Sequence, residues 1–226
     1  ETFPANATSL EDYKKTLKAA FLYAKTVTLC EIHWPETNRV VRRNRRIGTS
    51  MSGLAQFIQK HSLATLKDWC CNAYEHLRYV DKRLSRKFGV PESIKITSVK
   101  PSGTVSLLAG ATPGMHYPVS EYYIRRVRVA FDDPCLRALK KAGYRIEEAE
   151  TDPKFTRVVQ FPVTARLAAQ DERKGKEGKK KKMRAQHDVS VWEQLSLAAF
   201  MQRFYADNQT SVTIMFKDEE VKSLAP

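Results

Sequence analysis

The sequence lacks the features that mark membrane-spanning and secreted proteins. No run of 18 or more apolar residues occurs, so a transmembrane helix is excluded. The chain begins at Glu1, with neither an initiator methionine nor the basic start and apolar core of a signal peptide. We therefore expect that processing removed a segment or that the chain is a piece of a longer protein.

Cysteine is also scarce, with four among 226 residues and none in a Cys-x-x-Cys pair. Cys70 and Cys71 are adjacent, too close for an ordinary disulfide or a zinc knuckle. In the absence of a secretory signal, this usage predicts reduced core thiols, no metal site and a cytoplasmic protein.

The composition that is present belongs to a globular protein. Apolar residues make up 42% and charged residues 28% of the chain. The length fits one large domain or two small ones, which would bury roughly 70% of the unfolded surface if the domain were complete.

The net charge of +14 raises the possibility of nucleic-acid binding. Part of it lies in residues 171–184 (DERKGKEGKKKKMR), called here the Lys-rich run, and part in five arginines within residues 39–46. The Lys-rich run has no aromatic residue for base stacking, so it is typical of an exposed loop or insertion. Contact with an anionic partner is the alternative, and charge alone does not predict a nucleic-acid partner.

Local patterns predict alternating helices and strands. Thr8 and Glu11 have capping-box spacing, and the small residues of 47–55 indicate close backbone packing. We expect helix 191–205 to be buried, because it is apolar nearly all round. Alternation of this kind favours an α/β fold with largely parallel strands. The predicted helices are 10–24, 54–59, 63–88, 105–109, 134–142 and 191–205, and the predicted strands are 94–99, 122–131, 157–163 and 211–216.

The strongest chemical signal is the predicted strand, loop and helix start at residues 94–109. The loop PSGTVS at 101–106 offers backbone N–H groups, hydroxyls and the positive end of a helix dipole. Gly103 would let an anion approach the backbone, as in a phosphate cradle. The loop is not a Walker motif, because no Gly-Lys-Ser/Thr follows. A turn with a hydroxyl cap is the alternative.

Two further residues are candidates for chemistry. His116 lies in a turn rich in proline and glycine and could act as a base or a ligand, but a single histidine without a partner is more often structural. Asn208 precedes a predicted strand and could contact a ligand, although capping is the default role for asparagine there.

Several longer motifs resemble one enzyme family. Residues 100–116 (KPSGTVSLLAGATPGMH) resemble a signature of the adenosylcobalamin-dependent (class II) ribonucleotide reductases. The stretches WPETNR at 34–39, RRIGTSMSG at 45–53 and YADNQ at 205–209 are similar to this family in the same order. The similarity is strongest to the monomeric ribonucleoside-triphosphate reductase branch, and the Lys-rich run is a local departure from it.

The resemblance implies a fold and a set of site residues. The fold would be a ten-stranded α/β barrel, with this chain as its C-terminal half. In the family, the loop that matches 101–106 binds the phosphates of a ribonucleoside triphosphate substrate. Pro101, His116 and Asn208 would line the same cavity, with no residue assigned to cobalt. The phosphate-binding residues implied are Ser102, Gly103, Thr104, Val105 and Ser106.

The resemblance also implies radical chemistry, in which adenosylcobalamin initiates a protein thiyl radical that reduces the ribose. The family carries its radical cysteine in an Asn-Pro-Cys-x-Glu motif, which this sequence does not contain and which would lie upstream of Glu1. Electrons from a thioredoxin-type reductant would likewise arrive through segments missing here. We therefore expect no catalytic residue in this chain and no activity of the chain alone. The alternative is a non-catalytic nucleotide- or nucleic-acid-binding module derived from the barrel.

Overall fold

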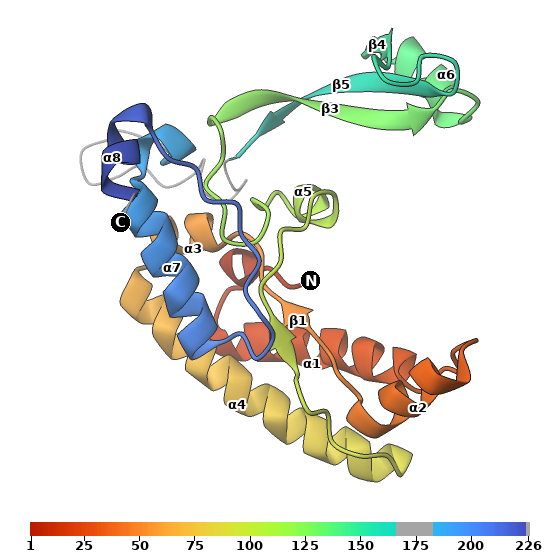
Figure 1. The fold of residues 1–226 in the computed structure, drawn as a ribbon, viewed down its shortest axis with the longest axis vertical. Coiled ribbons are helices and arrows are strands. Elements are labelled where there is room, and N and C mark those ends of the chain that lie inside the picture. Colours follow the sequence, from red (N-terminus) through yellow and green to blue (C-terminus); the bar gives the residue numbers. More distant parts are fainter. Residues whose placement is uncertain (166–182, 225–226) are drawn as a thin grey trace.

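The computed structural model describes residues 1–165 and 183–224 (Figure 1). No helix in these ranges is long and apolar enough to cross a membrane. The helices are η1 Pro4–Asn6, α1 Leu10–Val27, α2 Pro35–Asn44, α3 Leu54–Lys60, α4 Leu63–Phe88, α5 Val105–Leu108, α6 Cys135–Lys141, η3 Gln186–Asp188, α7 Val191–Phe204, η4 Asp218–Glu220 and α8 Val221–Leu224. The strands are β1 Thr49–Ser50, β2 Thr97–Ser98, β3 Tyr122–Ala130, β4 Arg145–Glu148 and β5 Thr156–Thr164.

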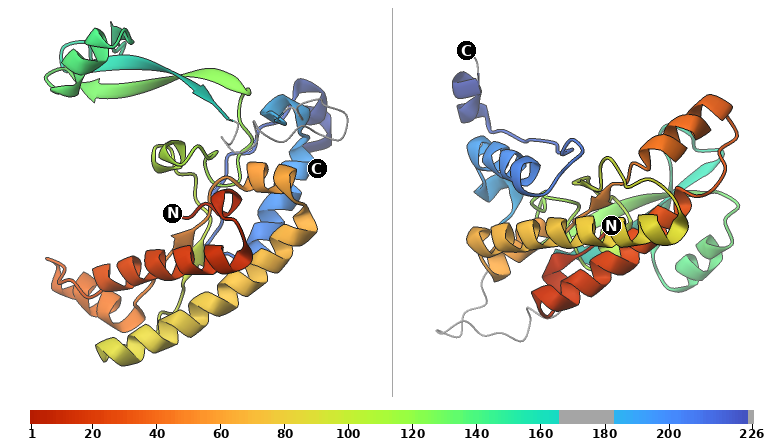
Figure 2. Two further views of the ribbon diagram at one scale, coloured as in Figure 1. Left: turned by 180° about the vertical axis from the view of Figure 1, so that it is seen from behind. Right: turned by 90° about the horizontal axis from the view of Figure 1, so that it is seen from below.

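The long helices α1 and α4 lie side by side and form the body of the molecule (Figure 2). Helix α4 has the predicted bounds, because its ends carry strong local signals. The Ser62 hydroxyl accepts a hydrogen bond from the Thr65 N–H at 3.0 Å, and Gly89 ends the helix with a φ of 63°. The predicted helix 63–88 is confirmed.

The cap of α1 differs from the predicted one by one residue. Ser9, not Thr8, is the cap, and its hydroxyl accepts from the Asp12 N–H at 3.2 Å. The Thr8 N–H donates to the Asp12 carboxylate, while Glu11 pairs with Lys14. Ser9 and Asp12 have the same three-residue spacing as Thr8 and Glu11, so the sequence offered two capping pairs.

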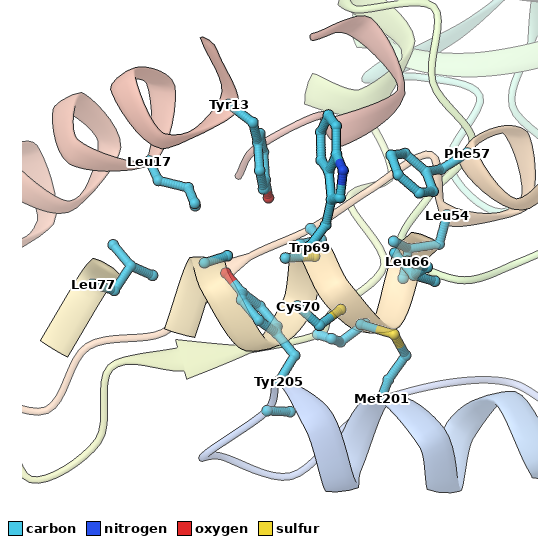
Figure 3. Close-up of a cluster of buried hydrophobic side chains, with 14 of the residues drawn as sticks. Tyr13, Leu17, Leu54, Phe57, Leu66, Trp69, Cys70, Leu77, Met201 and Tyr205 are labelled. Carbon is cyan, nitrogen blue, oxygen red and sulfur yellow. The ribbon is translucent and has the colours of Figure 1, made fainter. Parts of the chain in front are cut away.

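The hydrophobic core lies where α1, α3, α4 and α7 meet (Figure 3). The rings of Tyr13 and Trp69 stack with centroids 5.6 Å apart, and Phe57 meets Trp69 edge-on. Helix α7 contributes one face only: Met201 is fully buried, whereas Trp192 is 53% exposed. The expectation that α7 is buried all round is wrong, because nothing in the described residues covers its outer face.

An ion pair that the sequence patterns did not indicate is buried between the two long helices. The Lys25 ammonium on α1 lies 2.7 Å from the Asp81 carboxylate on α4, and both side chains are buried. The ammonium also donates to the Pro91 carbonyl and the Ser93 hydroxyl, and the Ser93 N–H donates to Asp81 at 2.7 Å. These bonds satisfy both charges and hold the chain that follows α4.

A short parallel pair, β1 and β2, runs through the body with Thr49 opposite Thr97. The predicted close packing is confirmed at Gly48, where a Cβ atom would lie 2.8 Å from the Ser98 hydroxyl oxygen. The predicted strand 94–99 shrinks to Thr97–Ser98.

The predicted strand 211–216 does not form. The Ser211 N–H donates to the Val99 carbonyl at 2.8 Å, but side chains take the backbone hydrogen bonds of Thr213 and Met215. The Thr213 N–H donates to His116, and both the N–H and the carbonyl of Met215 bond the side-chain amide of Gln194. The segment is therefore extended without a ladder.

The second sheet, in the order β3-β5-β4, is antiparallel, so the expectation of largely parallel strands is wrong for this part of the chain. Strands β3 and β5 pair over nine residues each, with Tyr122 opposite Thr164. Strand β4, which was not predicted, adds to β5, and α6 lies beside it. The antiparallel pair of β3 and β5 is called here the β3–β5 hairpin. Figure 1 shows it extending away from the helical body.

Two expectations about composition need correction. Cys70 is a buried core thiol, but Cys30 and Cys135 are exposed. Most of the Lys-rich run lies outside the described residues. At its end Met183 is buried against Ala55 and Ala165, so exposure does not extend through the whole of 171–184.

Candidate functional site

The loop at residues 101–106 is closed by its own serines. The Ser102 hydroxyl accepts a hydrogen bond from the Ser106 N–H at 3.1 Å, and the Ser106 hydroxyl donates to the Ser102 carbonyl. Ser106 is buried, whereas Ser102 is partly exposed. The two hydroxyls therefore hold the shape of the loop.

This closure leaves three consecutive backbone donors without partners. The N–H groups of Gly103, Thr104 and Val105 donate to no group in residues 1–165 or 183–224, and all three residues are exposed. Consecutive N–H groups in a turn form a concave set of partial positive charges that suits an anion. The predicted alternative, a turn with a hydroxyl cap, describes the Ser102–Ser106 bond but accounts for none of these donors.

Neighbouring segments fix the loop at its base. The Lys100 N–H donates to the hydroxyl of Ser50, in β1, at 3.0 Å. Gly114, with a φ of 52°, packs against the loop so closely that a Cβ atom would lie 3.0 Å from the Lys100 carbonyl oxygen and 3.3 Å from the Pro101 Cα. Only glycine fits this position readily. Pro101 itself is exposed and contributes through this packing.

The buried side chain of Gln56, on α3, holds the chain that leaves α5. Its Nε2 donates to the Gly110 carbonyl at 3.0 Å and to the Ala165 carbonyl at 2.6 Å, and its Oε1 accepts from the Thr112 N–H at 2.9 Å. The Ala111 N–H, between these contacts, donates to the Ser106 carbonyl at 2.8 Å. Gln56 thus connects α3 to both the loop and the end of β5.

A cation from β3 lies against the loop, and sequence patterns do not indicate it. The Arg125 guanidinium, from β3, donates to the Gly103 carbonyl. Arg125 is partly buried and has no acidic partner among the residues that the structure describes. A basic residue in an alternating strand gives no local sign of this contact, because only the hairpin geometry creates it.

His116 and Asn208 both bond to backbone groups. His116 Nε2 accepts from the Thr213 N–H at 2.9 Å, so the ring proton lies on Nδ1, 3.0 Å from the Pro113 carbonyl oxygen. The hollow that His116 lines, of about 10 Å³, is at the lower limit for one water molecule, and none of the loop residues borders it. Asn208 Nδ2 donates to the carbonyls of Ile47 and Thr97, which joins the chain leading to β1 to strand β2.

A polar cluster links the segment that follows the loop to α7. The Tyr117 hydroxyl donates to Glu193 at 3.0 Å, and Arg184 binds the same carboxylate at 2.7 and 2.8 Å. Burial, together with the bond to Glu193, raises the pKa of Tyr117 to about 12. The Arg184 hydrogen bonds lower the pKa of Glu193 despite its partial burial.

The described residues show no site in which protein side chains alone could hold a metal ion. They contain no cluster of three His, Cys, Asp or Glu side chains that could hold a metal. Both ring nitrogens of His116 are engaged, so this histidine does not fit a cobalt ligand. What the site presents is an anchored loop with anion-binding donors and one nearby guanidinium.

Comparison with known proteins identifies the family that contains this site. No family model matches the chain. The chain is 52% identical, over 96% of its length, to a probable adenosylcobalamin-dependent ribonucleoside-triphosphate reductase of Dictyostelium discoideum. It is 51% identical, over 97% of its length, to the adenosylcobalamin-dependent ribonucleoside-triphosphate reductase of Euglena gracilis. The chain belongs to the class II ribonucleotide reductase family.

Solved structures agree with this assignment. A crystal structure of a B12-dependent (class II) ribonucleotide reductase matches 96% of this chain with a TM-score of 0.76 and 31% identity, and the match covers 32% of that chain. The predicted α/β reductase barrel is confirmed as the fold to which this chain contributes a part. The alpha subunit of an Actinobacillus ureae class Id ribonucleotide reductase matches 98% of this chain and 44% of its own, with a TM-score of 0.54 at 15% identity, a likeness of fold alone.

The chain spans 26% of the Dictyostelium relative and 28% of the Euglena relative. A class II reductase contains much more than this chain, and its activity does not transfer to the chain as a finding. The position of the chain in the C-terminal half of the barrel stays a prediction, as do the roles of the individual loop residues.

Proposed function

We propose that this chain is the substrate-phosphate portion of an adenosylcobalamin-dependent ribonucleoside-triphosphate reductase. The observation that carries the proposal is the anchored loop at 101–106, whose three consecutive N–H groups are exposed and have no partner in the described residues. Backbone donors held in place before the ligand arrives bind an anion without the entropy loss of ordering the loop.

Within this proposal the loop residues have different roles. The N–H groups of Gly103, Thr104 and Val105 donate to phosphate oxygens. Ser102 and Ser106 keep the loop closed, and the exposed Thr104 hydroxyl is a further donor. Binding the phosphates holds the nucleotide so that its ribose has one orientation relative to the rest of the barrel.

The reaction proposed for the whole protein is reduction of the ribose 2′-carbon. Adenosylcobalamin, when bound, supplies the radical that starts this chemistry. The sequence has no Asn-Pro-Cys-x-Glu motif, and the Cys70 thiol is fully buried in the hydrophobic core, where no substrate reaches it. We therefore place the radical cysteine, and the thiols that receive electrons from a thioredoxin-type reductant, outside this chain.

The test is calorimetric titration of the 226-residue chain with a ribonucleoside triphosphate. Gly103→Val should weaken binding by about tenfold or more, since the added side chain blocks the approach to the N–H groups. A Cβ atom at Gly103 meets nothing closer than the Arg125 guanidinium, at 3.8 Å, so the fold should be unaffected. Thr104→Val should weaken binding about three- to tenfold through the lost hydroxyl.

Thr37→Val, which removes an exposed hydroxyl from α2, is the matched control and should bind as the unaltered chain does. Equal melting temperatures for all variants would show that the loss is local. Unchanged affinity of Gly103→Val would refute the phosphate-binding role of the loop.

The alternative function is nucleic-acid binding without catalysis. It would rest on the Lys-rich run, most of which lies outside the described residues, and the comparisons over almost the whole chain do not favour it. Binding led by that run would fall steeply with salt and survive Gly103→Val. Binding led by the loop would fail in Gly103→Val.

A further inference from the structure

A loop of backbone donors alone leaves most of the charge of a triphosphate unbalanced. The three free N–H groups carry only partial charges, and the motif has no lysine of the kind that a Walker loop places on the phosphates. In other triphosphate sites that charge is met by a lysine, an arginine or a metal ion. A triphosphate bound at this loop therefore needs a positively charged side chain close to it.

Arg125 meets this need from a distant part of the chain. It lies on β3, 22 positions after Gly103, and its guanidinium donates to the Gly103 carbonyl at the centre of the loop. A guanidinium has five N–H donors, so this bond leaves others available for a ligand bound at the neighbouring N–H groups. The partial burial of the side chain restricts the directions it can take.

The charges near Arg125 on the hairpin support this assignment. Two arginines on the same sheet are paired with carboxylates, Arg126 with Glu147 and Arg157 with Glu148. Arg125 has no such partner in residues 1–165 or 183–224 and contacts only a neutral carbonyl. A partly buried guanidinium with an uncompensated charge is suited to an anionic ligand.

We propose that Arg125 is a substrate-binding residue that neutralises the phosphates held by the loop at 101–106. The inference rests on the proposed function, because it needs a phosphate at the loop. It also gives the β3–β5 hairpin a role, since the hairpin brings Arg125 to the loop from outside the helical body (Figure 1). The hairpin thereby becomes part of the substrate site.

The test compares Arg125→Gln with Arg128→Gln in the 226-residue chain, titrated with inorganic phosphate, diphosphate and tripolyphosphate. Arg128 is exposed on the same strand, three residues further along, so the alternation of a strand places it on the opposite face. Both changes remove one positive charge. Arg125→Gln should weaken tripolyphosphate binding about tenfold to a hundredfold, the range expected for a charged hydrogen bond.

The dependence on ligand charge separates binding from loop support. If Arg125 neutralises phosphate, the loss in Arg125→Gln grows from phosphate to tripolyphosphate. If it only supports the loop, all three anions lose affinity by the same factor, and the proposal is wrong. Arg125→Lys keeps the charge without the planar fork, so it should recover part of the tripolyphosphate affinity. This variant also tests the proposal if Arg125→Gln fails to fold.

The outcomes also separate this inference from the proposed function. Equal affinity of Arg125→Gln and Arg128→Gln for tripolyphosphate, with normal binding by the unaltered chain, would overturn the role of Arg125 and leave the loop intact. No binding by the unaltered chain would refute the phosphate site and the role of Arg125 together.

Discussion

Gln56 shows how a single buried side chain determines the geometry of the candidate site. Its amide bonds two carbonyls and one N–H from two other segments, and the chain it holds leads directly to Ser106. No motif marks this glutamine, because a polar residue in a short helix gives no sign that it is fully buried. Arg125 has no sequence signal for the same kind of reason: its partner is a carbonyl in a distant loop.

Replacing this glutamine gives a prediction at the residue scale. Gln56→Met keeps the volume but leaves the Gly110 carbonyl, the Ala165 carbonyl and the Thr112 N–H without partners. The free energy of unfolding should fall by about 2–3 kcal/mol, as measured by urea denaturation. Gln202, on α7, makes the same kinds of bond to Ala206 and Thr210 but is exposed.

Gln202→Met is accordingly the matched control and should cost less than about 1 kcal/mol, since water replaces the lost bonds. Equal losses for the two variants would contradict the structural role assigned to Gln56.

At the scale of elements, α1 and α4 depend on the buried pair of Lys25 and Asp81. Asp81→Asn should lower the free energy of unfolding by about 3–5 kcal/mol, because it leaves the Lys25 charge buried without its counterion. The double variant Lys25→Met with Asp81→Leu should be more stable than Asp81→Asn, since it buries no charge. A double variant at least as unstable as Asp81→Asn would show that the charges themselves are not the cause. Thermal and urea denaturation followed by circular dichroism measure both.

The elements also show how far sequence patterns reach. Helix α4 was predicted to the residue, because its apolar stripe and both of its caps are local signals. The strand predicted at 211–216 failed because Gln194 and His116, both distant in the sequence, take its backbone bonds. Strand β4 has no clear sequence signal because it is a short, largely polar edge strand, RIEE, without a run of alternating apolar residues.

In the candidate site too, the sequence predicts the local features but not the contacts between distant residues. The loop, its glycine and its free donors were predicted from a contiguous stretch, and the structure places the predicted loop residues together. The expected shared cavity stays a prediction: His116 and Asn208 bond to backbone groups elsewhere, and no residue of the loop borders the hollow that His116 lines. Contacts made by folding, rather than residue type, decide those roles.

For the whole molecule, the similarity to class II ribonucleotide reductases covers almost all of this chain and about a quarter of its relatives' length. The loop at 101–106, which we propose binds phosphate, lies within that quarter, as do its supports from α3 and the hairpin and the buried core. Substrate binding is therefore the part of the proposed activity that this chain can test by itself.

The most direct measurement is an amide ¹H–¹⁵N spectrum of the 226-residue chain, recorded as tripolyphosphate is added. The account predicts that the largest shifts occur at the N–H groups of Gly103, Thr104 and Val105, because these donate to the anion. Gly89, at the far end of α4, is an internal reference and should not move. Shifts confined to residues 171–182, with residues 103–105 unchanged at saturation, would contradict the account.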